Sequence, residues 1–275
     1  MITRTTKFEF LRRRTAQLFL AAAIGSLALA ANTCAQFGFP PPQHPANPKA
    51  IAPIDLTGYW VAVVTEDWRF RMLTPPKGDY GGVPLNSEGK RVADSWDPAR
   101  DEASGNSCKS YGAAAIMRVP TRLHISWEND TTLRVDTDAG TQTRLLHFGG
   151  TPPAGTAQWQ GYSAASWEGL PEAGMFRIPT TMRGIGEGPA REGYLKVITT
   201  HLRAGYLRKN GAPYSENAIL EEYFDSFKEP NGDAWLVVTA IVTDPQYLYE
   251  PFIVSSHFKK QADASGWNPT PCEAK

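Results

Sequence analysis

The sequence has no excess of charge of either sign. Lys and Arg together number 28 and Asp and Glu together number 28, so the formal net charge is +0. Proteins that bind nucleic acid or an anionic membrane surface by electrostatics need a positive field. The composition therefore predicts no nucleic-acid partner and leaves neutral small molecules and ordinary protein surfaces as partners.

Common catalytic signatures are also absent. The chain contains no Gly-x-Ser-x-Gly elbow, no phosphate-binding loop and no His-Glu-x-x-His pair. The glycine-rich run at residues 184–188 lacks the last glycine of a dinucleotide fingerprint. The histidines of the domain lie in separate predicted strands, so a metal site would need three strands to converge. These histidines are His124, His147, His201 and His257. We therefore expect no cofactor and no metal.

Long apolar runs are scarce, and the longest one lies at residues 18–31, directly after a basic segment that includes Arg12, Arg13 and Arg14. It is shorter than the roughly 20 residues that span a bilayer. This order of charge, apolar core and small residues is typical of a secretory signal peptide, predicted at residues 1–35. We expect a periplasmic or secreted protein without a membrane-spanning segment after signal removal; the cleavage site, lipidation of Cys34 and twin-arginine export stay open.

Cysteine is rare, with 3 in the chain. Signal cleavage is plausible before Ala31 or before Gln36, and Cys108 and Cys272 lie beyond both points. An oxidising compartment favours a bridge between them, which would join the tail of the chain to its early middle. The alternative is two unpaired thiols.

Proline content and the alternation of apolar and polar residues divide the chain after the signal peptide into a leader and a domain. Residues 36–54 are rich in proline and predict an extended leader, and residues 55–275 predict a single domain. Residues 58–72 alternate like one extended strand that would carry Trp60, Glu66 and Trp68 on the same face. A short helix is expected at residues 86–96.

The later sequence predicts mainly strands. Three lie at hairpin spacing, at residues 122–128, 132–137 and 141–148, and a fourth at 159–168. Four more follow a long Gly/Pro-rich loop (169–193), at 194–203, 219–227, 234–242 and 252–259. At least nine strands with little helix favour an all-β fold. We expect a closed antiparallel β-barrel with a polar-lined cavity, with a β-sandwich as the alternative.

Several segments together resemble a family of exported, β-rich bacterial proteins of uncharacterised activity. They follow one order along most of the mature chain: residues 55–60 (DLTGYW), 84–89 (PLNSEG), 96–98 (WDP), 167–169 (WEG), 211–216 (GAPYSE), 244–248 (DPQYL), Pro251 and Cys272. The resemblance implies a lipocalin-like barrel and no established activity. This chain differs from the family in having Tyr214 where His is usual and in inserting residues 170–193, which suggests a specialised entrance.

Titratable groups beside apolar strand faces are the candidate catalytic residues. If Glu66 faced an apolar interior, burial would raise the pKa of its carboxyl group and suit it to acid/base chemistry. The alternative is a solvated carboxylate paired with a nearby Arg. His201 is a second candidate base, and Tyr214 could stabilise developing charge.

Aromatic and basic side chains make up the candidate ligand-binding set. Arg208 could pair with a ligand carboxylate, or simply with Glu216 or Glu221 at the surface. The full set is Trp60, Trp68, Arg69, Tyr162, Trp167, Tyr206, Arg208 and Glu216.

Three functions fit these features. The first is periplasmic binding of a small hydrophobic or aromatic molecule in the barrel. The second is a cofactor-free lyase, isomerase or hydratase that uses the same cavity. The third is a structural envelope protein without a ligand, and the oligomeric state stays open.

Overall fold

The computed structural model describes residues 47–152, 154–169 and 193–274. The expected signal peptide, the first part of the proline-rich leader and the inserted segment 170–192 lie outside the described residues. In the described part, no helix is both long enough and apolar enough to cross a membrane.

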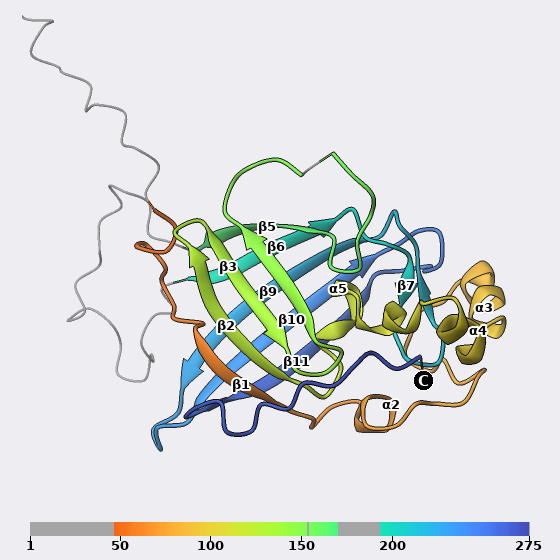
Figure 1. Ribbon diagram of the computed structural model, residues 1–275, viewed down its shortest axis with the longest axis horizontal. Helices are drawn as coiled ribbons and strands as arrows, with labels where there is room; N and C mark the ends of the chain where they lie inside the picture. Colours follow the sequence, from red (N-terminus) through yellow and green to blue (C-terminus); the bar gives the residue numbers. More distant parts are fainter. Residues whose placement is uncertain (1–46, 153, 170–192, 275) are drawn as a thin grey trace, which may run out of the picture. The chain divides into compact units, whose positions relative to one another are not determined.

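Strands dominate the described chain. Those of the main sheet are β1 (Gly58–Val63), β2 (Arg122–Asn129), β3 (Thr132–Thr137), β4 (Gln142–His147), β5 (Tyr162–Glu168), β6 (Tyr194–Thr200), β9 (Ile219–Lys228), β10 (Ala234–Thr243) and β11 (Phe252–Gln261). Within the described residues these nine strands close a barrel in the order β1, β11, β10, β9, β6, β5, β4, β3, β2 (Figure 1). The predicted closed barrel is confirmed, and the sandwich alternative is wrong. The expected polar-lined interior cavity is also wrong for the described residues, because hydrophobic side chains fill the inward positions.

One strand pair differs from the expected antiparallel pattern. β4 and β5 run parallel and pair only at Leu146 with Ser163 and at His147 with Ala164. A parallel pair needs a long connection. The described parts of this connection, residues 148–152 and 154–161, arch away from the barrel wall (Figure 1). The barrel is therefore mixed, with a short seam at β4 and β5.

Alternation along the strands fills the barrel. Inward positions such as Leu123, Val135, Leu195 and Phe224 are 0 % exposed and belong to one hydrophobic cluster. Outward positions on the same strands are polar or partly exposed. The period of two that predicts a strand thus also builds the core.

A buried ion pair interrupts this apolar interior. Arg144 on β4 makes two hydrogen bonds to Glu222 on β9, at 3.0 and 2.6 Å, and both side chains are 0 % exposed. The second guanidinium nitrogen also lies 3.5 Å from the Ser163 hydroxyl on β5 and 3.3 Å from the Thr199 hydroxyl on β6. The pair therefore links four strands on both sides of the seam.

Short helices and a small hairpin gather at one end of the barrel (Figure 1). We refer to this group as the cap. A second hydrophobic cluster, which includes Leu85, Leu207, Leu220 and Val242, packs the cap onto the ends of β9 and β10. The cap elements are α2 (Trp68–Arg71), α3 (Ser87–Asp94), α4 (Pro98–Ala103), the 3-10 helix η2 (Ser107–Tyr111), α5 (Ala113–Ile116), β7 (Gly205–Tyr206) and β8 (Pro213–Tyr214).

The first predicted strand is less than half as long as expected. β1 ends at Val63, and Asp67 adopts a left-handed backbone with φ 51° at the start of α2. Asp is among the few non-glycine residues that tolerate this conformation. The turn separates Trp60, buried in the core, from Glu66 and Trp68, so these three side chains do not share a strand face.

Both ends of the described chain are bonded to the rest of the domain, one by a disulfide and the other by hydrogen bonds. Cys108 and Cys272 form a disulfide across a sequence separation of 164 residues, which confirms the predicted pairing. Near the other end, the Pro48 carbonyl accepts a hydrogen bond from the Trp167 indole, and the Lys49 amide donates to the Asp130 carbonyl. The last residues of the proline-rich leader thus contact the barrel.

We expect loss of the disulfide to destabilise the fold. Replacing Cys108 and Cys272 with Ser should lower the free energy of unfolding by about 5 kcal/mol, because the bridge restricts the unfolded chain over its separation of 164 residues. Urea denaturation of the oxidised protein and of the double variant measures this difference. Equal midpoints would contradict the expectation.

We expect the buried ion pair to behave as a unit. Arg144→Met alone should cost about 3–5 kcal/mol of unfolding free energy, since it leaves Glu222 charged and buried without a partner. Arg144→Met combined with Glu222→Leu should recover most of that loss. Urea denaturation of the single and double variants tests the coupling, and additive losses would contradict it.

Candidate functional site

A pocket lies on the outer face of the barrel beside the β4–β5 seam. Its cavity volume is about 640 Å³, within the range of about 300–1,000 Å³ that is usual for small-molecule sites. We call it the seam pocket. Its walls come from the outward positions Thr143, Leu145 and His147 of β4, from Gln142 at the start of that strand, from the connection between β4 and β5, and from the start of β5. The lining residues outside β4 are Gly149, Gly150, Thr151, Gln158, Trp159, Gln160, Gly161 and Tyr162.

Aromatic rings form one wall of the seam pocket. His147 and Tyr162 stack with ring centroids 5.0 Å apart and an interplanar angle of 11°. Arg203 lies over the Trp159 ring at 4.2 Å and donates a hydrogen bond of 2.6 Å to Asn106, so the indole is held in place. The rings thus form a preset surface on which a flat molecule can stack.

The polar groups of the seam pocket carry no formal charge at neutral pH. They are amides and hydroxyls of Gln and Thr, the tyrosine phenol and the His147 imidazole. Burial lowers the pKa of His147 below its ordinary value, which keeps the ring neutral. The pocket therefore suits an uncharged ligand.

The disulfide contacts Gln142, one of the residues that line the seam pocket. The Gln142 side-chain amide donates a hydrogen bond of 2.6 Å to the Gly140 carbonyl and lies 3.5 Å from the Cys272 sulfur. Its oxygen accepts a hydrogen bond of 3.1 Å from Gln160, whose amide also donates to the Tyr111 carbonyl at 2.7 Å. The bridge thus helps to fix the side chains between the two splayed strands.

The three predicted catalytic residues do not contact one another. Glu66 accepts hydrogen bonds from Thr65 and Arg71 and lies 3.0 Å from the His257 ring. His201 is exposed and bonds to Thr200. Among the described residues, no hydrogen bond or ion pair joins any two of Glu66, His201 and Tyr214.

The pKa of Glu66 is shifted downward, whereas burial in the apolar interior expected from the sequence would raise it. Partial burial favours the protonated acid, but hydrogen bonds from Thr65 and His257 and the charge of Arg71 outweigh it and hold the pKa of Glu66 below its usual value. The cause is the turn after β1, which places the carboxylate beside Arg71 instead of in the apolar interior. Glu66 is therefore the paired carboxylate of the alternative interpretation.

Tyr214 is enclosed between two glycines. A Cβ atom at Gly112 would lie 2.1 Å from its hydroxyl oxygen and one at Gly205 would lie 2.6 Å from it. The side chain is 0 % exposed, its hydroxyl has no hydrogen-bond partner among the described residues, and burial raises the pKa of the phenol. These contacts give Tyr214 a packing role.

The predicted ligand-binding residues are spread over the molecule. Tyr162 lines the seam pocket and Arg208 lines a small cavity beneath the cap. Trp60 donates to the Leu56 carbonyl inside the core, and Tyr206 donates to Asp101 in the cap. The others lie apart from both cavities: Trp167 packs on Phe148, Arg69 pairs with Asp79, and Trp68 and Glu216 are exposed.

Most of the pocket lining has no distinctive signal in the sequence. Trp159 and His147 stand out only as an aromatic residue and a strand histidine, whereas Gln142, Gln158 and Gln160 belong to no pattern. Period-two alternation does identify His147 and Leu145 as outward positions. Nothing in the sequence indicates that β5 pairs with β4 in parallel, which is what forms the pocket.

Four segments of the family resemblance meet at the cap, namely residues 84–89, 96–98, 211–216 and 244–248, whereas residues 55–60 and 167–169 belong to the barrel wall. Asn86 caps α3 and donates to the Gln246 carbonyl at 3.1 Å. Asp244 is 1 % exposed and accepts hydrogen bonds from the Ser215 amide and hydroxyl at 2.6 and 2.9 Å. A Cβ at Gly211 would lie 2.3 Å from Trp96. These motif residues hold the cap together.

Fold and site together define a closed, mixed nine-stranded β-barrel protein with an external pocket at its seam. No family model, no curated protein and no solved structure matches the chain. The described residues contain no group of three or more His, Cys, Asp or Glu side chains placed to hold a metal ion.

We expect Tyr214→Phe to keep or raise stability, by up to about 1 kcal/mol, because it removes a buried hydroxyl without a partner. Gly112→Ala should instead cost about 1–3 kcal/mol, because its methyl group would overlap that hydroxyl. Thermal unfolding of both variants measures the changes. A clear loss of stability in Tyr214→Phe would show that the hydroxyl has a bonding role.

Proposed function

We propose that this protein binds a small, uncharged aromatic or hydrophobic molecule in the periplasm or outside the cell, and that the ligand occupies the seam pocket. The observation that carries the proposal is a cavity of about 640 Å³ whose lining is aromatic and amide-rich and contains no charged side chain. A flat ligand would stack against Trp159 or Tyr162 and bond to the glutamine amides.

The position of the pocket follows from the packing of the barrel. The inward side chains form two hydrophobic clusters, and Glu222 stands on β9 between Phe224 of the first cluster and Leu220 of the second. Since these side chains and the ion pair occupy the interior, the proposed site lies on the outer face. The bridge between Cys108 and Cys272 is in keeping with an oxidising compartment, which supports the export part of the proposal. The closed barrel supports the lipocalin-like character that the resemblance implies.

The other two hypotheses stay predictions. A cofactor-free enzyme would need its acid, base and charge-stabilising groups around one substrate, and Glu66, His201 and Tyr214 lie with separate neighbours. A structural envelope protein would bind no ligand and would show no saturable binding of any probe.

Titration with a neutral aromatic probe tests the proposal. Indole and phenol should bind in a saturable way, measured by calorimetry and by tryptophan emission, whereas benzoate should bind at this pocket at least about tenfold more weakly because its charge finds no partner there. Trp159→Ala should weaken binding of indole about tenfold or more.

Trp68→Ala is the matched control, because Trp68 is 62 % exposed on α2 and does not line the pocket. It should leave the affinity unchanged. Absence of saturable binding by any neutral probe would reject the binding function. Binding that is unaffected by Trp159→Ala and Tyr162→Ala would reject the seam pocket as its location.

A further inference from the structure

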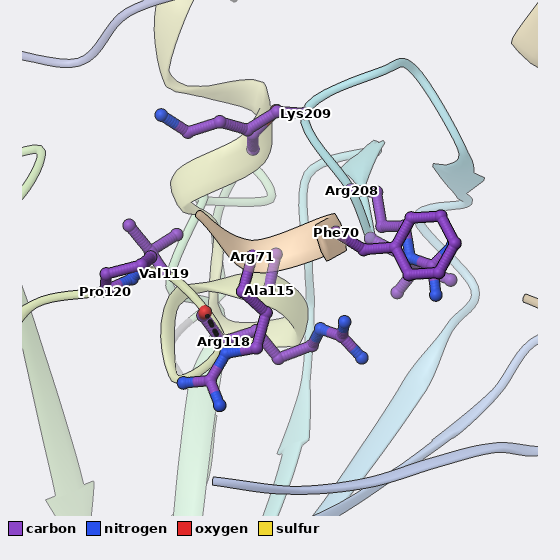
Figure 2. A pocket seen from close by; sticks show the side chains of 10 residues that line it. Phe70, Arg71, Ala115, Arg118, Val119, Pro120, Arg208 and Lys209 are labelled. Carbon is purple, nitrogen blue, oxygen red and sulfur yellow. Dashed lines mark hydrogen bonds between the residues drawn. The ribbon is translucent and has the colours of Figure 1, made fainter. Parts of the chain in front are cut away.

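A second, much smaller cavity lies beneath the cap where three arginines meet. Arg71 from α2, Arg118 after α5 and Arg208 after β7 line a volume of about 30 Å³ (Figure 2). Their side chains are only 2 %, 8 % and 2 % exposed. A space of this size holds about one water molecule or the head group of a small ligand.

The charges around this cavity do not balance. Glu66 pairs with Arg71, which also donates from its Nε to the Arg118 carbonyl at 2.8 Å. Among the described residues, Arg118 and Arg208 form ion pairs only with Asp67, at 3.2 and 3.9 Å, while Glu66 and Asp79 attract them from farther away. The nearby Asp79 pairs with the exposed Arg69, and Lys209 adds a further cation to the lining. Two buried guanidinium groups therefore face one half-exposed carboxylate.

Arg208 also has a donor without an acceptor. Its Nη1 donates to the Gly81 carbonyl at 2.5 Å, whereas its Nε is buried and has no hydrogen-bond partner among the described residues. A buried charged donor left without an acceptor costs about 1–3 kcal/mol or more. An acceptor in the cavity would remove this cost.

The two guanidinium groups are held by aromatic rings. Arg208 lies over the Phe70 ring at 4.1 Å and Arg118 over the Phe252 ring at 5.2 Å. Figure 2 shows Arg118 extending toward Arg208 and Phe70, while the Arg71 guanidinium turns toward the Arg118 carbonyl. Burial and the charge of Arg118 lower the pKa of Arg208 to about 10, so it stays charged at neutral pH.

We propose that Arg118 and Arg208 form a binding site for a small oxyanion, the carboxylate or phosphate group of a ligand that enters the cavity beneath the cap. The anion supplies the missing negative charge and accepts the free Nε–H of Arg208. Ala115, Val119 and Leu207 form apolar walls that exclude water around it. Only the head group fits. The site is separate from the seam pocket and independent of the function proposed there.

Calorimetry with sodium acetate and with inorganic phosphate, at constant ionic strength set with sodium chloride, tests the site. At least one probe should bind the whole protein in a saturable way, and Arg208→Met should weaken that binding about tenfold or more, as expected for a charge-assisted hydrogen bond. Arg91→Gln is the matched control and should leave the binding unchanged: Arg91 is 69 % exposed, pairs with Glu88 and does not line the cavity.

A measurement on the unaltered protein keeps the test valid even if the substitution at the buried Arg208 unfolds the chain. Two arginines lie over the Phe70 ring, Arg208 at 4.1 Å and Arg69 at 5.0 Å, and the resonance of Arg69 is the one that Arg69→Gln removes. In protein with ¹⁵N-labelled arginine, the remaining Nε–H resonance in contact with Phe70, that of Arg208, should shift as the probe is added. Binding of acetate alone assigns a carboxylate head group, and binding of phosphate alone assigns a phosphate. No saturable heat and no shift with either probe would overturn the proposal.

Discussion

The Arg144–Glu222 pair is the interaction on which the closure of the barrel depends. The barrel wall has its shortest strand pairing at the parallel seam, where β4 and β5 share two residue pairs. The Arg144 side chain extends from β4 into the interior and contacts Glu222 on β9 and hydroxyl groups on β5 and β6. These hydrogen bonds across the interior compensate for the few backbone hydrogen bonds between β4 and β5. Because the interior is filled, the recess between the splayed strands and their arch lies on the outer face. The parallel pairing of β4 and β5 therefore both reduces the hydrogen bonding of the barrel wall and creates the seam pocket.

The two buried arginine sites differ in how their charge is satisfied. Arg144 has a bidentate carboxylate partner and two hydroxyls around it, as expected for a structural ion pair. Arg118 and Arg208 share Asp67, and the Nε of Arg208 has no acceptor among the described residues. The Nε of Arg144 also has no hydrogen-bond partner among the described residues, so the two sites differ in their carboxylates. Arg144 has the Glu222 carboxylate to itself, whereas Arg118 and Arg208 share one carboxylate and have room for a further anion.

The sequence by itself determined the barrel strands, because alternation with a period of two and short turns are local properties of the chain. It also indicated the Cys108–Cys272 bridge, since an oxidising compartment favours pairing. Alternation even contains a signal for the buried ion pair, because Arg144 stands two residues before the inward Leu146 and Glu222 stands between the inward Leu220 and Phe224.

Only the tertiary structure decided the rest. β1 ends at Val63, and the left-handed turn at Asp67 places Glu66 beside Arg71 and not in the expected interior. The parallel seam and the meeting of Arg118 with Arg208 join residues far apart in the chain, and no local pattern encodes which strands become neighbours. Strand formation depends on nearby residues, whereas pockets and charge clusters depend on long-range contacts, and this is why the sequence determined the wall and the folded chain alone determined the sites.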